Sequence, residues 1–190
     1  MRLVTRSDFD GLGCAAILKE VGKIEDIKFV HPKDVQDGII EVTANDILAN
    51  IPYVKGCGAW FDHHSSEHER KAFGEFKGKC DPTASSAARV VYNFYGGYDG
   101  FKNDHLDDLV DAVDRSDSAL FTKEEILDPD GWVLLSFVMD PRTGLGRYRD
   151  YRISNYALMM DMIDYCREKT DKQILELPDI KERTTRYFEQ

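Results

Sequence analysis

The 190-residue chain is poor in cysteine, in long apolar runs and in positive charge. It has four cysteines and no Cys-x-x-Cys pair, so we expect reduced thiols and no structural zinc site. No segment approaches the roughly 18 apolar residues of a membrane span, and the N-terminus does not resemble a signal peptide. We therefore expect a cytoplasmic protein without membrane partners.

The shortage of positive charge also limits the class of substrate. Asp and Glu number 35 against 25 Lys and Arg, a formal net charge of −10. Because like charges repel, long nucleic acid is not an expected partner. A small polyanionic substrate would need local cations, such as metal ions or clustered arginines.

The apolar pattern indicates an α/β protein. Short apolar runs predict strands over residues 1–5, 26–31, 39–43, 45–52 and 58–62. Helical spacing follows the first strand and recurs over 82–97, 103–117 and 154–169, while 131–140 fits either a helix or a strand. This alternation predicts a doubly wound, mainly parallel β-sheet flanked by helices.

Polar side chains follow several of the predicted strands. The first strand leads to Asp8 and Asp10, and the 45–52 strand ends near Asn50. The stretch AWFDHHSSE brings Asp62, His63 and His64 directly after a buried strand. In open parallel sheets, ligands bind at the carboxyl ends of the strands, so we expect these groups at one edge.

The 103–117 helix adds further acids, namely Asp111, Asp114 and Asp117. Carboxylates packed together repel each other, and a divalent cation removes that conflict. Oxygen and imidazole ligands suit Mn²⁺, Mg²⁺ or Zn²⁺, and such a site suits phosphoryl hydrolysis. Each element also has a simpler interpretation: helix caps for Asp8 and Asp10, an exposed polar pair for the histidines, and a solvated helix face for the three acids.

Four segments in order, SDFDGLG, FDHHSS, PTASSAARVVY and AVDRSD, resemble the DHH phosphoesterase family over roughly residues 1–120. The segments TRSDFDGLGCA and WFDHHSSE are most similar to the exopolyphosphatase-related branch. This resemblance implies a two-metal site, usually with Mn²⁺, that hydrolyses phosphoanhydrides or phosphodiesters by metal-activated water.

The resemblance also implies roles for individual residues. It assigns metal binding to Asp8, Asp10, His63 and Asp114, and it places His64 against the phosphate. Asp62 would orient a histidine. Ser85 and Ser86, at the start of the PTASSAARVVY helix, would help to hold an anion or would cap the helix.

Two positions depart from the family pattern. Arg6 stands where relatives carry His or Asp, and Asn50 stands where they carry a metal-bridging aspartate, unless Asp46 has that role. We therefore hypothesise one well-bound metal, with Arg6 beside the missing one as a catalytic phosphate clamp. The alternative is that Arg6 points to solvent or pairs with a surface carboxylate.

The most basic stretch, DPRTGLGRYRDYR, contains Arg142 and Arg147, which we predict to bind substrate unless neighbouring acids tie the loop down. We assign residues 1–170 to a DHH-type catalytic domain. Residues 171–190 are assigned to a C-terminal helix or linker toward an absent second domain of the kind that the family resemblance implies. Either the protein is a single-domain variant or the sequence is a fragment of a longer chain, and we favour the fragment. No glycine-rich substrate motif of the kind found in that domain was recognised.

The leading hypothesis is a metal-dependent phosphoesterase that cleaves polyphosphate, a short oligonucleotide or a cyclic dinucleotide. A non-catalytic nucleotide- or phosphate-binding member of the same fold is the alternative. A purely structural α/β protein is the third possibility. The oligomeric state is left open, a dimer included.

Overall fold

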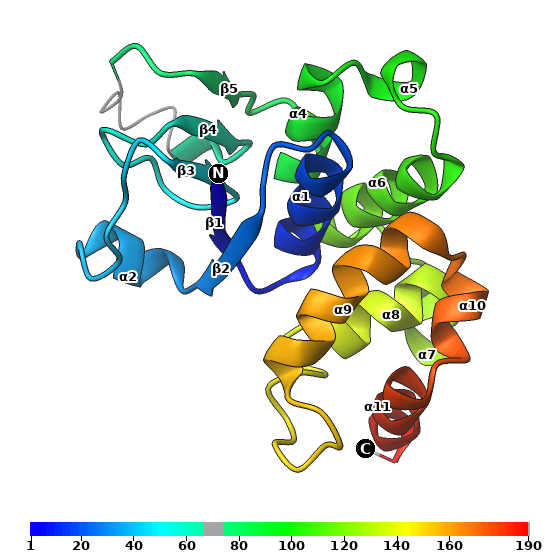
Figure 1. Ribbon diagram of the computed structural model, residues 1–190. Helices are drawn as coiled ribbons and strands as arrows, with labels where there is room; N and C mark the ends of the chain where they lie inside the picture. Colours follow the sequence, from blue (N-terminus) through cyan, green and yellow to red (C-terminus); the bar gives the residue numbers. More distant parts are fainter. Residues whose placement is uncertain (67–73, 190) are drawn as a thin grey trace.

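The computed structural model describes residues 1–66 and 74–189 and is built on a five-stranded sheet (Figure 1). The strands are β1 (Arg2–Arg6), β2 (Asp26–Val30), β3 (Asp46–Ala49), β4 (Ala59–Asp62) and β5 (Gly78–Cys80). Their order across the sheet is β2-β1-β3-β4-β5, and every pairing is parallel. The prediction of a mainly parallel α/β sheet flanked by helices is confirmed.

Side-chain alternation along the strands separates two apolar layers. Leu3, Ile47 and Phe61 point to one face, where they join the larger core with α1 (Phe9–Glu20), α4 (Ala87–Phe94), α6 (Asp104–Asp117) and α9 (Asn155–Glu168). Val4, Leu48 and Trp60 point to the other face, which is covered by α2 (Pro32–Gln36) and by the residues that follow β3. Both faces are thereby removed from water.

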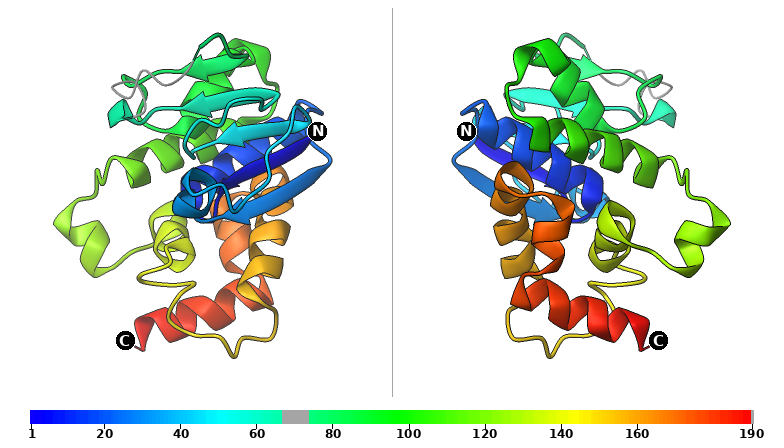
Figure 2. Two further views of the ribbon diagram at one scale, coloured as in Figure 1. Left: turned by 90° about the vertical axis from the view of Figure 1, so that its left-hand side faces the viewer. Right: turned by 90° about the vertical axis from the view of Figure 1, so that its right-hand side faces the viewer.

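The remaining helices extend the larger core. They are α5 (Gly97–Gly100), α7 (Lys123–Leu127), α8 (Gly131–Met139), α10 (Asp171–Leu175) and α11 (Pro178–Phe188). The open alternative for residues 131–140 is resolved in favour of a helix, α8. Helices α9 to α11 lie at the end of the molecule opposite β5 (Figure 2). Ile174 and Ile180 belong to the buried core, so this C-terminal segment packs on the rest of the chain. Among the described helices, none is long and apolar enough to cross a membrane.

Some predicted elements were wrong or were missed. Residues 39–43 form an irregular stretch rather than a strand: Ile39 is 68% exposed and so has no sheet face to bury against. The helix predicted over 82–97 begins only at Ala87, because Ser86 caps it by accepting from the Arg89 N–H. The short elements α2 and β5 were not predicted.

The carboxyl ends of β1, β3 and β4 meet at one edge of the sheet. The connection that follows β1 runs over one face of the sheet through α1, and the connection that leads to β3 runs over the other face through α2. Open α/β sheets bind their ligands between two neighbouring strands of this kind, here β1 and β3. Arg6 ends β1, Asn50 follows β3, and His63 follows β4. Asp46 lies at the opposite end of β3, so it cannot replace Asn50 in a site at this edge.

Candidate metal and phosphate site

Asp10 is an almost fully enclosed carboxylate at this edge. It lies in the first turn of α1 and is only 2% exposed. The backbone N–H groups of Ala87 and Ala88, at the start of α4, donate to its two oxygens over 3.0 and 2.7 Å. Burial raises the pKa of Asp10 well above its usual range, and Asp117 and Asp8 add to the rise, whereas the two N–H donors lower it. A cation beside Asp10 would relieve this penalty.

His63 and Asp117 face Asp10 from β4 and from the last turn of α6. His63 Nε2 lies 3.2 Å from Asp117 Oδ2 and 3.7 Å from Asp10 Oδ2. This nitrogen is buried, yet it makes no hydrogen bond of acceptable geometry within residues 1–66 and 74–189. One ligand atom from each of the three residues lies within 4.8 Å of the others. Two carboxylates and an unpaired imidazole nitrogen fit a divalent cation such as Mn²⁺ or Mg²⁺.

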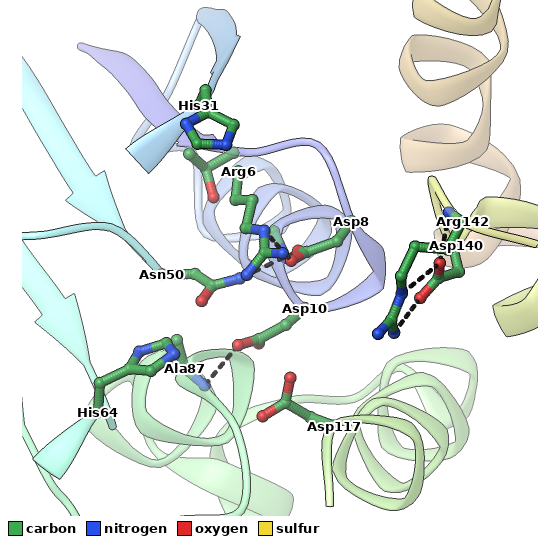
Figure 3. A network of polar contacts seen from close by, with 12 residues as sticks. Arg6, Asp8, Asp10, His31, Asn50, His64, Ala87, Asp117, Asp140 and Arg142 are labelled. Atoms are coloured by element: carbon green, nitrogen blue, oxygen red, sulfur yellow. Dashed lines mark hydrogen bonds and ion pairs between the residues drawn. The ribbon is translucent and has the colours of Figure 1, made fainter. Parts of the chain in front are cut away.

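Asp8 is held differently, although it is two residues from Asp10. Its Oδ1 caps α1 by accepting from the Gly11 N–H over 2.9 Å, and it also accepts from Asn50 Nδ2 over 3.0 Å. Its Oδ2 lies 3.0 Å from Arg6 Nε (Figure 3). Burial raises the pKa of Asp8, while the Gly11 N–H and the Arg6 charge lower it.

The backbone around Asp8 is tightly constrained. A Cβ on Gly11 would lie 2.0 Å from the Arg6 carbonyl oxygen, so only glycine lets α1 begin this close to β1. Asn50 has a φ of 54°, in the left-handed region that Asn and Asp tolerate better than other non-glycine residues. This turn directs the Asn50 amide back to Asp8.

His64 is paired with the aspartate that precedes the two histidines. Its Nδ1 lies 2.8 Å from Asp62 Oδ1. This hydrogen bond raises the pKa of His64, and burial opposes the rise. Asp62 is 1% exposed, and its Oδ2 has no hydrogen-bond partner among the residues that the structure describes. The structure therefore places Asp62 against His64, whereas His63 Nδ1 lies 3.4 Å from the Ala84 carbonyl oxygen.

Asp114 and Ser86 bond to each other rather than to the Asp10, His63 and Asp117 cluster. Ser86 Oγ donates to Asp114 Oδ1 over 2.6 Å, and Arg89 Nε donates to Asp114 Oδ2 over 2.7 Å. Ser86 is fully buried, so its hydroxyl serves as a helix cap and is closed to a substrate. Ser85 is exposed. The aspartate that reaches His63 is Asp117, one helical turn beyond Asp114. In the sequence, the only signal for Asp117 was that it follows Asp111 and Asp114 at intervals of three residues.

A cavity of about 440 Å³ opens over the acids and has Arg6, Asp8, Asp10, Asp117, Asp140 and Arg142 in its lining. Arg142 is 88% exposed, and its guanidinium pairs with Asp140. Arg147 is exposed and outside this lining. A cavity of about 1280 Å³ lies nearer the amino ends of β4 and β5, at Ala59 and Gly78. It is larger but does not include the acid and imidazole groups.

No family model matches the chain, and no curated protein matches it significantly. A solved structure does: it is described as PggH, a pGpG-specific phosphodiesterase from Vibrio cholerae, and it is 50% identical in sequence. The chain shares its fold. The TM-score is 0.86, and the match covers 99% of this chain but 60% of the PggH chain. The chain therefore spans about three fifths of the length of the phosphodiesterase that it matches.

Proposed function

We propose that this chain is a metal-dependent phosphodiesterase of the DHH type that hydrolyses a short linear dinucleotide such as pGpG. The observation that carries this proposal is the Asp10, His63 and Asp117 cluster at the ligand-binding edge of the sheet. The sequence identity of 50% to a pGpG-specific phosphodiesterase supports the substrate class. The net charge of −10 also favours a small anion over a long one.

The residues would divide the work as follows. Asp10, His63 and Asp117 would hold Mn²⁺, or Mg²⁺ in its place, and Asp10 is kept in position by the two N–H groups of α4. The ion, when bound, supplies Lewis acidity toward a phosphoryl oxygen and lowers the pKa of a water ligand. Cleavage adds one water across one phosphodiester bond of pGpG and gives two guanosine monophosphates.

His64 and the arginines would act on the substrate itself. Because Asp62 accepts the hydrogen bond of His64 Nδ1, the Nε2 atom is left to contact the phosphate or the leaving oxygen. Arg142, in the lining of the 440 Å³ cavity, would meet a second phosphate, whereas Arg147 and Ser85 would reach substrate only outside this cavity. We place this activity in the cytoplasm.

The test is hydrolysis of defined substrates by the purified protein with Mn²⁺. Chromatography would follow pGpG, a cyclic dinucleotide, a longer oligonucleotide and polyphosphate, with His63→Ala as the control. We expect pGpG to be cleaved to GMP at a rate at least about 100-fold above the variant, since the variant loses a metal ligand. Turnover of polyphosphate alone would instead favour the exopolyphosphatase-related branch. Tight binding of pGpG without turnover would show a non-catalytic binding protein.

A further inference from the structure

Every oxygen of Asp8 is already engaged within the chain. Oδ1 accepts from Gly11 and Asn50, and Oδ2 faces the Arg6 guanidinium at 3.0 Å. The Asp8 side chain is 20% exposed, which leaves it little access to further ligands. Among residues 1–66 and 74–189, the metal-capable group comprises Asp10, His63 and Asp117, and Asp8 is not part of it.

The charges around the cavity also indicate a single metal ion. The cavity is lined by the carboxylates of Asp8, Asp10, Asp117 and Asp140. Arg6 balances Asp8, and Arg142 balances Asp140. Only Asp10 and Asp117 remain without a guanidinium, and one divalent ion would balance their two negative charges. A second ion would bring two positive charges to a position that has no carboxylate left to offset them.

Arg6 is also placed to contact a substrate. Its side chain is half exposed, and in the described part of the chain its two terminal nitrogens have no hydrogen-bond partner. It lines the 440 Å³ cavity on one side and a cavity of about 180 Å³ on the other, which includes Asn50 and His64. A guanidinium keeps its charge at any working pH, and its fork of donors matches two phosphate oxygens.

From these contacts we propose that the site binds one divalent ion, and that the Arg6 guanidinium, held in place by Asp8 and Asn50, is a fixed phosphate-binding group which takes the place of a second. Asn50 donates to Asp8 instead of bridging two metals, and Asp8 holds Arg6 against the position of the scissile phosphate. The substrate part of this inference rests on the proposed function. The metal count does not, because it can be measured without substrate.

Isothermal titration and electron paramagnetic resonance would count Mn²⁺ ions bound per metal-free chain. We expect one in the wild-type protein. The double variant Arg6→Gln/Asn50→Asp frees Asp8 and adds a second carboxylate, so it should bind a second Mn²⁺. The matched control is Arg6→Lys/Asn50→Asp, which adds the same carboxylate but keeps a positive charge and should still bind one. Asp at position 50 tolerates the left-handed backbone, so melting curves should show a folded protein.

Each outcome is decisive. Two tight sites in the wild-type protein, together with intact hydrolysis of pGpG, would overturn this inference and leave the proposed function standing. One site without hydrolysis of pGpG would overturn the function and leave the metal count standing. No bound Mn²⁺ would overturn both. A double variant that still binds a single ion would show that the Arg6–Asp8–Asn50 triad is not what excludes the second one.

Discussion

At the scale of single residues, two aspartates on one helix have different surroundings. Asp114 accepts from Ser86 and Arg89 and joins α6 to the start of α4. Asp117 lies one turn further on, 3.2 Å from His63, and is 34% exposed. Burial raises the pKa of Asp117, and the nearby histidines oppose the rise. An acid that is strained without a cation suits a metal site better than one already paired with arginine.

Exchange of each aspartate for asparagine should separate the two roles. We expect Asp117→Asn to weaken Mn²⁺ binding by at least about 10-fold, because the site loses a charged ligand. Asp114→Asn should leave the Mn²⁺ affinity within a few-fold of wild type. It should lower the free energy of unfolding by about 1–2 kcal/mol, because Arg89 loses one of its two carboxylate partners and keeps only Asp111. Titration calorimetry and urea unfolding measure the two effects. Weaker Mn²⁺ binding by Asp114→Asn, with unchanged binding by Asp117→Asn, would show that Asp114 is the ligand.

The sequence indicated much of the site but not the pairing of its members. Residues at strand ends are predictable, because a buried apolar run that stops at polar groups marks the ligand edge of a parallel sheet. The choice between Asp114 and Asp117 depends on the rotation of α6 about its axis, which is set by the packing of Leu106, Leu109 and Val113. Spacing along one helix carries no information about that rotation relative to β4.

At the scale of elements, β1 and β3 are held together at both ends. At the ligand edge the Arg6–Asp8–Asn50 triad joins them. At the opposite edge Asp46, 2% exposed, accepts from Arg2 Nε over 2.7 Å and from the Thr43 N–H over 2.7 Å. Hydrogen bonds from Arg2 and Thr43 lower the pKa of Asp46 although burial opposes them. This second clamp stabilises the strands that carry Arg6 and Asn50 without taking part in the chemistry.

The Asp46 clamp should therefore appear as a pH-dependent stability term. We expect Asp46→Asn to lower the free energy of unfolding by about 1–3 kcal/mol at pH 7. Because the folded pKa lies below the usual 3.8, the stabilisation is full above that value. It is lost as the pH falls through the lower folded pKa.

Urea unfolding of the wild-type protein and the variant from pH 7 to pH 3 would measure this difference. The matched control is Asp37→Asn, which removes the exposed pair with Lys33 and should cost less than about 0.5 kcal/mol. A difference between wild type and Asp46→Asn that grows as the pH falls would contradict the assignment.

Elements were predictable where length and pattern were both strong. The runs that became β1, β3, β4, α6 and α9 have clear apolar periodicity, and α8 is ambiguous only because it is apolar on all sides. The strand β5 has three residues, Gly78–Cys80, and exists because it pairs with β4 rather than because of its own sequence. Tertiary pairing of this kind leaves no periodic signal.

At the scale of the whole molecule, the negative net charge and the arginines of the site have opposite electrostatic effects on an anionic substrate. The net charge of −10 repels anions at long range, whereas Arg6 and Arg142, which line the 440 Å³ cavity, would attract an anion at short range under the proposed function. The repulsion grows with the number of phosphates on the substrate, and the local attraction does not. Under the proposed function, a dinucleotide that fits beside the arginines would therefore be favoured over a long strand that crosses the acidic surface.

This balance predicts an unusual dependence on ionic strength. Salt screens the long-range repulsion, because the Debye length falls from about 30 Å at 0.01 M to about 8 Å at 0.15 M. We expect kcat/KM for a 20-nucleotide strand to stay constant or to rise a few-fold across this range, and that for pGpG to change by less than twofold. Enzymes that hold nucleic acid in a basic groove lose affinity steeply over the same range, because bound counterions are released. A steep fall with salt for the long strand would show that a basic track, such as the loop with Arg142 and Arg147, dominates over the acidic surface.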